Sequence, residues 1–137
     1  MSEFFENYQE IPAAFFEHRE LAHWQAEQFD KCVDNLPLSH IAILIGYSMN
    51  YSHNHRESIQ GEHWSHHQTT VVPVVVYKKY RLSDGTVTAT CALSEVFLTP
   101  DLNHSNQMIQ HIVATLLEKY QKEDPELSHV HIWSDGG

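Results

Sequence analysis

The chain has 137 residues, of which 42% are hydrophobic, and its formal net charge is −10. This length and composition predict a globular protein with its own core, and the acidic balance argues against a broad phosphate-binding surface, because nucleic-acid affinity comes largely from Lys and Arg. No apolar run is long enough to span a membrane and no secretory signal precedes the first helix, so we expect an intracellular protein.

The N-terminal segment, residues 1–37, predicts one amphipathic helix. Pro12 suits the first turn of a helix and Pro37 would end it, so we expect the helix to run from about Pro12 to about Asn35. Apolar side chains recur along it at roughly helical spacing, and we expect Trp24 to lie in a core. These side chains are Phe15, Leu21, Trp24, Phe29, Cys32, Val33 and Leu36.

The second segment, residues 38–137, begins with strands. Residues 41–45 are continuously apolar, which is typical of a buried strand, and residues 48–68 are polar and predict a long loop. Residues 69–80 predict a second strand, in which Pro73 favours an edge position or a bulge. Asp84-Gly85 predicts a tight hairpin turn, after which residues 86–98 return as the antiparallel partner.

A second helix is predicted by apolar side chains at three-four spacing, with Asn103 or Ser105 as its N-cap. These side chains are Met108, Ile109, Ile112, Val113, Leu116, Leu117 and Tyr120. Residues 129–133 then predict a short strand, which can lie parallel to residues 41–45 because a helix crossover separates the two. The sequence therefore predicts an α/β fold with an N-terminal helix, three antiparallel strands, a helix and a parallel strand beside the first.

The ends of the first and last strands are where we expect a site. Because these strands are neighbours in the predicted order, the residues that follow them, Gly46 and Asp135, would approach each other. Two carboxylates at such a place can hold divalent metal ions, which activate a water or hydroxyl and stabilise the leaving oxygen of a phosphodiester. Only Asp135 supplies a carboxylate in this sequence.

Several short motifs follow one another along residues 40–137. They are, in chain order, Gly46-Tyr47-Ser48-Met49-Asn50-Tyr51; Trp64, Gln68, Thr70 and Pro73; Asp101 and His104; and Ser134-Asp135-Gly136. In order and spacing they resemble the ribonuclease-H-like core of acidic-triad (DDE-type) cut-and-paste transposase-like proteins. The match is complete in the first motif except at Gly46, where the family has an Asp.

The resemblance implies a ribonuclease-H-like mixed sheet in residues 38–137, metal-dependent cleavage and strand transfer of DNA, and nuclear localisation. It implies Mg²⁺ or Mn²⁺ as the ancestral cofactor, Asp135 as the surviving catalytic ligand, Asp101 as a second catalytic carboxylate and His104 as a metal-site residue. Two departures oppose activity, since Gly46 cannot bind a metal and the family's third acid lies beyond the last residue of this sequence. A single carboxylate binds a divalent ion poorly. We therefore expect a degenerate or truncated transposase-like domain with weak or absent catalysis and DNA binding.

A His-rich loop offers an alternative function. Its imidazoles suit Zn²⁺, nickel or copper, and they predict a non-enzymatic metal- or protein-binding module; a polar loop that is merely rich in His is the plainer interpretation. The five histidines are His53, His55, His63, His66 and His67. An inert domain from a decayed element is a third possibility, and an exposed sheet edge at the C-terminus would favour self-association.

Plainer interpretations also stand beside the motif residues. Asp101 suits a helix start, where the dipole favours an acid, and His104 would be an exposed polar residue. Gly46 would be a turn residue that needs unusual backbone angles, and Asn50 would bond the backbone locally.

Lysines and arginine gather at one place in the chain. Lys78, Lys79 and Arg81 form its only basic cluster in sequence. A solvated strand end is the plain interpretation of this cluster, and a small phosphate contact is the sharper one.

Overall fold

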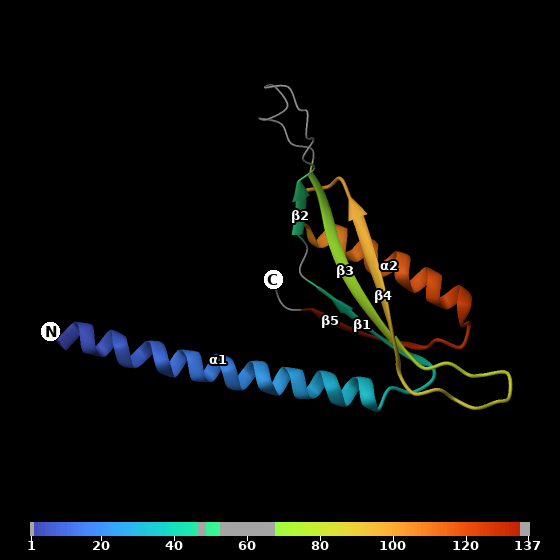
Figure 1. The fold of residues 1–137 in the computed structure, drawn as a ribbon, viewed down its shortest axis with the longest axis horizontal. Coiled ribbons are helices and arrows are strands. Elements are labelled where there is room, and N and C mark those ends of the chain that lie inside the picture. Colours follow the sequence, from blue (N-terminus) through green and yellow to red (C-terminus); the bar gives the residue numbers. More distant parts are fainter. Residues whose placement is uncertain (1, 47–48, 53–67, 135–137) are drawn as a thin grey trace, which may run out of the picture. The chain divides into compact units, whose positions relative to one another are not determined.

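The computed structural model describes residues 2–46, 49–52 and 68–134, with their side chains from Pro12 onward. Two compact units divide the chain, Met1–Asn35 and Leu36–Gly137. The described residues contain two helices and a mixed five-stranded sheet, with a helix first (Figure 1). The predicted α/β class with a mixed sheet is confirmed.

Helix α1, Ser2–Asp34, lies in the first unit. Its expected start at Pro12 is wrong, because Pro12 lies inside the helix, where its ring removes one main-chain hydrogen bond. The expected core position of Trp24 is also wrong, since this side chain is 58% exposed and Phe15 and Leu21 are exposed as well. A single helix cannot enclose a core by itself. No helix in the described ranges is long and apolar enough to cross a membrane.

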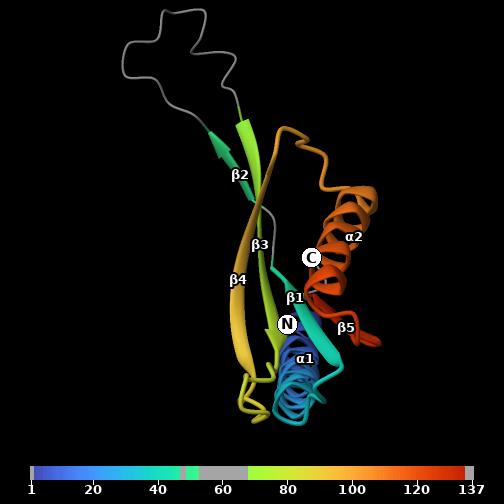
Figure 2. The same cartoon turned by 90° about the vertical axis from the view of Figure 1, so that its right-hand side faces the viewer.

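The second unit is built on the sheet. Its strands are β1 (His40–Ile45), β2 (Met49–Ser52), β3 (Gln68–Lys78), β4 (Cys91–Thr99) and β5 (His129–Ser134). Strand β3 is central, because it pairs antiparallel with β4 on one edge and with β1 and β2 on the other. Strand β1 pairs in parallel with β5, as the helix crossover predicted (Figure 2).

Two expectations about the strands fail. Met49–Ser52 lies in the expected loop but forms β2, because it pairs with the first residues of β3. Pro73 lies neither at an edge, since β3 has neighbours on both sides, nor at a bulge in the β3–β4 ladder, whose register is unbroken from residue 70 to residue 78. Strand β1 pairs with residues 74–78 and β2 with residues 68–71, so Pro73 falls between the two ladders, where its missing N–H is not required.

The hairpin turn between β3 and β4 is present, but its first arm ends at Lys78 and its second arm starts later than expected. Gly85 has a φ of 85°, the left-handed region that favours glycine, and its N–H donates to the Leu82 carbonyl at 2.9 Å. Strand β4 begins at Cys91 rather than at residue 86. An isolated bridge pairs Arg81 with Val87, and Val87 is 49% exposed, so the continuous pairing expected from residue 86 onward does not include this part of the hairpin.

Helix α2, Asn106–Glu123, covers one face of the sheet and completes the core (Figure 2). Ser105 is its N-cap and accepts a hydrogen bond from the Met108 N–H. The buried core contains Ile41, Ile43, Ile45, Val72, Val74, Val76, Met108, Ile112, Leu116 and Tyr120. Because side chains alternate along a strand, the even-numbered residues of β1 lie on the face opposite α2.

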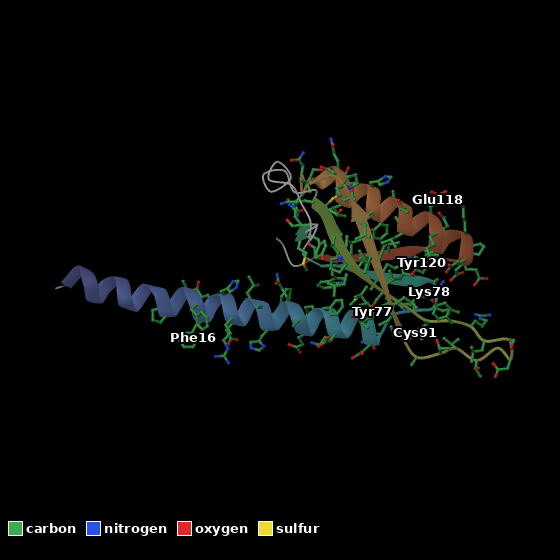
Figure 3. The ribbon with its side chains drawn as sticks, turned by 45° about the horizontal axis from the view of Figure 1, so that its top comes forward. Phe16, Tyr77, Lys78, Cys91, Glu118 and Tyr120 are labelled. Carbon is green, nitrogen blue, oxygen red and sulfur yellow. The ribbon has the colours of Figure 1, made fainter. Side chains whose placement is uncertain are left out.

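Polar contacts tie α2 to the sheet. The Tyr120 hydroxyl donates to Glu95 Oε1 at 3.0 Å, and Lys119 pairs with the same carboxylate. Burial, together with this carboxylate, raises the pKa of Tyr120 above its ordinary value. The Lys78 ammonium lies 3.3 Å from Asp124 Oδ2, and Figure 3 shows Lys78 and Tyr120 at the same end of the sheet.

Candidate functional site

The carboxyl end of β1 is shaped by a close contact with Pro73. The Gly46 N–H donates to the Pro73 carbonyl at 2.9 Å, and a Cβ built on Gly46 would lie 2.9 Å from Pro73 Cγ. The φ of Gly46 is not positive, so the interpretation of unusual backbone angles is wrong. Glycine fits here without any shift of its neighbours, whereas a Cβ at this position would require the Pro73 ring to move.

Four of the motif residues meet in one polar network at the same end of the sheet. The buried Thr70 hydroxyl on β3 lies 2.8 Å from Asn50 Oδ1 on β2 and 2.7 Å from the Asp101 carbonyl. His104 Nε2 lies 3.0 Å from the same Asn50 oxygen. The Thr70 hydroxyl has one proton, so it donates to either the Asn50 oxygen or the Asp101 carbonyl at a given moment. The Asn50 oxygen has two lone pairs and can accept from both Thr70 and His104. The network joins strands β2 and β3 to the loop before α2.

This network changes the interpretation of Asn50 and leaves the roles of Asp101 and His104 open. The Asn50 side-chain oxygen contacts side chains that are far away in sequence, rather than the local backbone that was expected. Asp101 Oδ1 accepts the Asn103 N–H at 2.9 Å, which stabilises the loop that leads to Ser105. Asp101 is exposed and His104 is exposed as well, so both can be reached from solvent.

The other predicted site residues lie outside the described ranges. These are Asp135 and the loop histidines His53, His55, His63, His66 and His67. The register ends with Ile45 beside Ser134 at this edge of the sheet. Within the part of the chain that the structure describes, no three His, Cys, Asp or Glu side chains converge as a metal site requires.

The basic cluster lines a surface pocket of about 310 Å³ at the other end of the sheet. Lys78 is only 3% exposed and pairs with Asp124, so a solvated strand end is the wrong interpretation for this residue. The pocket is lined by Leu38, Lys78, Lys79, Tyr80, Arg81, Glu123, Asp124 and Glu126. Because three acids share the lining with three bases, the pocket does not favour a phosphate.

Three histidines that the sequence reasoning passed over lie together at the amino end of β1. The register places His40 beside His129 and Ala42 beside His131, so all three rings share the face opposite α2. His40 Nδ1 lies 3.0 Å from His131 Nε2, and the His40 ring stacks on His129 with centroids 4.3 Å apart. Burial, followed by the neighbouring His129 and His131, lowers the pKa of His40.

A signal for these histidines was present in the sequence. His129 and His131 alternate along the last predicted strand, and His40 stands at the start of the first. Since the two strands were expected to be parallel neighbours, the three imidazoles could have been placed on one face.

A sequence-family comparison covers the second unit and the end of α1. The profile described as Domain of unknown function (DUF8701) matches residues 25–137. The chain belongs to the DUF8701 family. No curated protein and no solved structure matches it. The description of this family states no activity.

Proposed function

We propose that residues 38–137 form a ribonuclease-H-like domain of the transposase-like type that does not itself cleave DNA. The strand arrangement carries this proposal. Strands β4, β3 and β1 are successive antiparallel neighbours, and β5 returns after α2 to lie parallel to β1. This is the arrangement that the resemblance implies, and a right-handed helix crossover makes the parallel return possible.

Contacts between the motif residues support the same relationship. Gly46 and Pro73 come from separate motifs and touch each other at the end of β1. Asn50, Thr70 and His104 come from three motifs and share one hydrogen-bond network. Motif residues that are distant in sequence and contact one another indicate a single local structure rather than chance matches.

The same contacts argue against metal-dependent cleavage. A two-metal nuclease needs several oxygen ligands around its ions. Gly46 supplies none, and a Cβ at this position would lie 2.9 Å from Pro73 Cγ. Asp101 directs an oxygen to the Asn103 N–H. The described residues therefore do not fit the Mg²⁺ or Mn²⁺ pair of the ancestral reaction, and the net charge of −10 disfavours DNA as a present partner.

A cleavage assay tests the inactive state. Purified chain is incubated with supercoiled and single-stranded DNA in the presence of Mg²⁺ or Mn²⁺, and we expect no cleavage above that of a mock preparation. Metal-dependent cleavage that disappears in Asp135→Ala would overturn the proposal of an inactive domain.

A gain-of-binding variant tests the ancestry of the site. In Gly46→Asp with Pro73→Ala, the second change makes room for the restored carboxylate. We expect this double variant to bind Mn²⁺, measured by the loss of the free-ion electron paramagnetic resonance signal, and to lose the binding when Asp135→Ala is added. Pro73→Ala alone is the matched control. A folded double variant with no gain in Mn²⁺ binding contradicts a former metal site at this position.

A further inference from the structure

We propose that His40, His129 and His131 form a binding site for a divalent transition metal of the zinc class. The site lies on the face of the β1–β5 pair opposite α2, at the amino end of β1, and includes neither a motif residue nor a histidine of residues 53–67. It does not depend on the transposase-like function, because its residues belong to none of those motifs.

The spacing of two nitrogens is the first support. His40 Nδ1 and His131 Nε2 face each other at 3.0 Å. Two imidazole nitrogens bound to one tetrahedral zinc at about 2.0–2.1 Å lie roughly 3.3 Å apart. As the side chains stand, no three described His, Cys, Asp or Glu residues already form a metal site. Both rings must therefore turn about their side-chain bonds until their lone pairs converge on one ion.

The third ring has a partner for one of its nitrogens. Ser128 Oγ lies 3.3 Å from the Ser39 carbonyl and 2.8 Å from His129 Nδ1, and the metal-binding tautomer is the one in which Ser128 Oγ accepts from the Nδ1–H of His129. The lone pair of His129 is then on Nε2, the form in which a histidine binds metal while its other nitrogen is held by a hydrogen bond. The ring now stacks on His40, and it must turn about its side-chain bonds to direct Nε2 at the ion.

The backbone fixes the three rings near one another. Their Cα positions belong to two paired strands in register, with His40 opposite His129 and His131 two residues further along. Side chains two residues apart on a strand lie on the same face. Because the strands are held by the sheet, the ligands lose little additional freedom when an ion binds.

The proton balance of binding is simple. In the metal-free pair one ring donates its N–H to the lone pair of the other across the 3.0 Å contact. When the ion binds, the donor ring moves its proton to its second nitrogen, and both facing nitrogens present lone pairs. The three imidazoles stay neutral, and water completes the coordination.

Zinc titration by calorimetry tests the proposal, in a full-length reference chain in which His53, His55, His63, His66 and His67 are replaced by Gln. This replacement removes the loop as a second source of imidazoles. We expect the reference chain to bind one zinc ion. Introducing either His40→Ala or His131→Ala should lower the zinc affinity by at least ~10–100-fold, the loss that follows removal of an outer-shell partner of a metal site. His111→Ala, at an exposed position of α2, is the matched control and should leave the affinity unchanged.

Nitrogen-15 spectra of the imidazoles keep the test independent of any folding defect in these variants. In the reference chain, saturating zinc should move the signals of His40 Nδ1 and His131 Nε2 into the metal-bound range. Unchanged imidazole signals, or zinc binding of equal strength in the reference chain and in folded His40→Ala and His131→Ala variants, would overturn the proposal and leave an ordinary histidine–histidine hydrogen bond.

Discussion

The two ends of the β1–β5 pair use the same backbone arrangement for opposite purposes. At the carboxyl end, Gly46 has no side chain and lies close to the Pro73 ring. The polar side chains nearby form hydrogen bonds with one another. At the amino end, His40 and His131 bring two nitrogen atoms face to face, and His129 stacks on His40. The end that carries the family resemblance has Gly46 where a carboxylate is expected, and the end without a motif carries three imidazoles on one face. Ligand chemistry is decided by the side chains that a strand pair carries, not by its topology.

The largest expected effect comes from the buried ion pair at the amino end. Asp124→Asn keeps the shape of the side chain but leaves the Lys78 ammonium, 3% exposed, without its counter-charge. We expect a loss of about 2–3 kcal/mol in the free energy of unfolding, below the ~3–5 kcal/mol of fully buried pairs because Asp124 is partly exposed. Urea denaturation measures it. Lys78→Met combined with Asp124→Asn should recover most of the loss, and failure of this recovery would show that the charge is not the cause.

The next prediction distinguishes a steric clash from backbone strain as the reason for a glycine at residue 46, at the carboxyl end of β1. Gly46→Asp should lower the free energy of unfolding by about 1–3 kcal/mol, because its Cβ meets Pro73 Cγ. Pro73→Ala should relieve most of this loss in a double-mutant cycle measured by urea denaturation.

Gly85→Ala is the matched control for that cycle. It costs stability through the positive φ of residue 85, where a Cβ meets no atom within 4 Å, so Pro73→Ala should not relieve it. Equal relief of both glycine variants would contradict a local clash at residue 46.

A smaller effect tests the motif network. Thr70→Val keeps the shape of a fully buried side chain but removes the hydroxyl that contacts Asn50 and the Asp101 carbonyl. The expected loss is about 1–2 kcal/mol of unfolding free energy, and thermal or urea unfolding measures it. Thr115→Val on the exposed face of α2 is the control. A loss no larger than that of the control would mean that the network does not hold the loop to the sheet.

The smallest effect is a pH dependence at the histidine end. The pKa of His40 is lowered below 6.5 in the folded chain, so the unfolded state binds more protons as the pH falls from about 6.5. Stability should therefore decrease below this pH and be unaffected by His40 above it. Urea unfolding between pH 7.5 and 5 should show a shallower decrease in His40→Asn than in the natural chain. The same dependence of unfolding free energy on pH in both chains would contradict a lowered pKa of His40.

The sequence predicted those elements whose pattern is repeated along the chain. The three-four spacing of Met108, Ile112 and Leu116 identified α2, and the helix crossover identified the parallel strand. Strand β2 was missed because its four residues are all exposed and acquire their conformation from pairing with β3. Pro73 was misplaced because the gap between two ladders is a tertiary feature, and the core position of Trp24 was wrong because helical periodicity does not show whether a partner is present.

The candidate sites were also predictable only as far as sequence patterns reach, because their contacts depend on tertiary structure. Motif order identified Asn50, Thr70, Asp101 and His104, but only the structure shows that they share hydrogen bonds. The role of Gly46 depends on a neighbour that is 27 positions away in sequence, so no local pattern reveals it. The histidine cluster needs the parallel register as well as residue identity, and a search for dense His segments leads to residues 53–67 instead.

A nuclear magnetic resonance titration with Mg²⁺ and then Zn²⁺ tests the contrast between the two ends most directly. It follows the amide signals of both ends in one uniformly labelled sample. We predict that Mg²⁺ leaves the signals of Asn50, Thr70 and Asp101 in place, and that Zn²⁺ moves those of His40, His129 and His131. Shifts caused by Mg²⁺ at Asn50 and Asp101, with no response of the three histidines to Zn²⁺, would contradict the account.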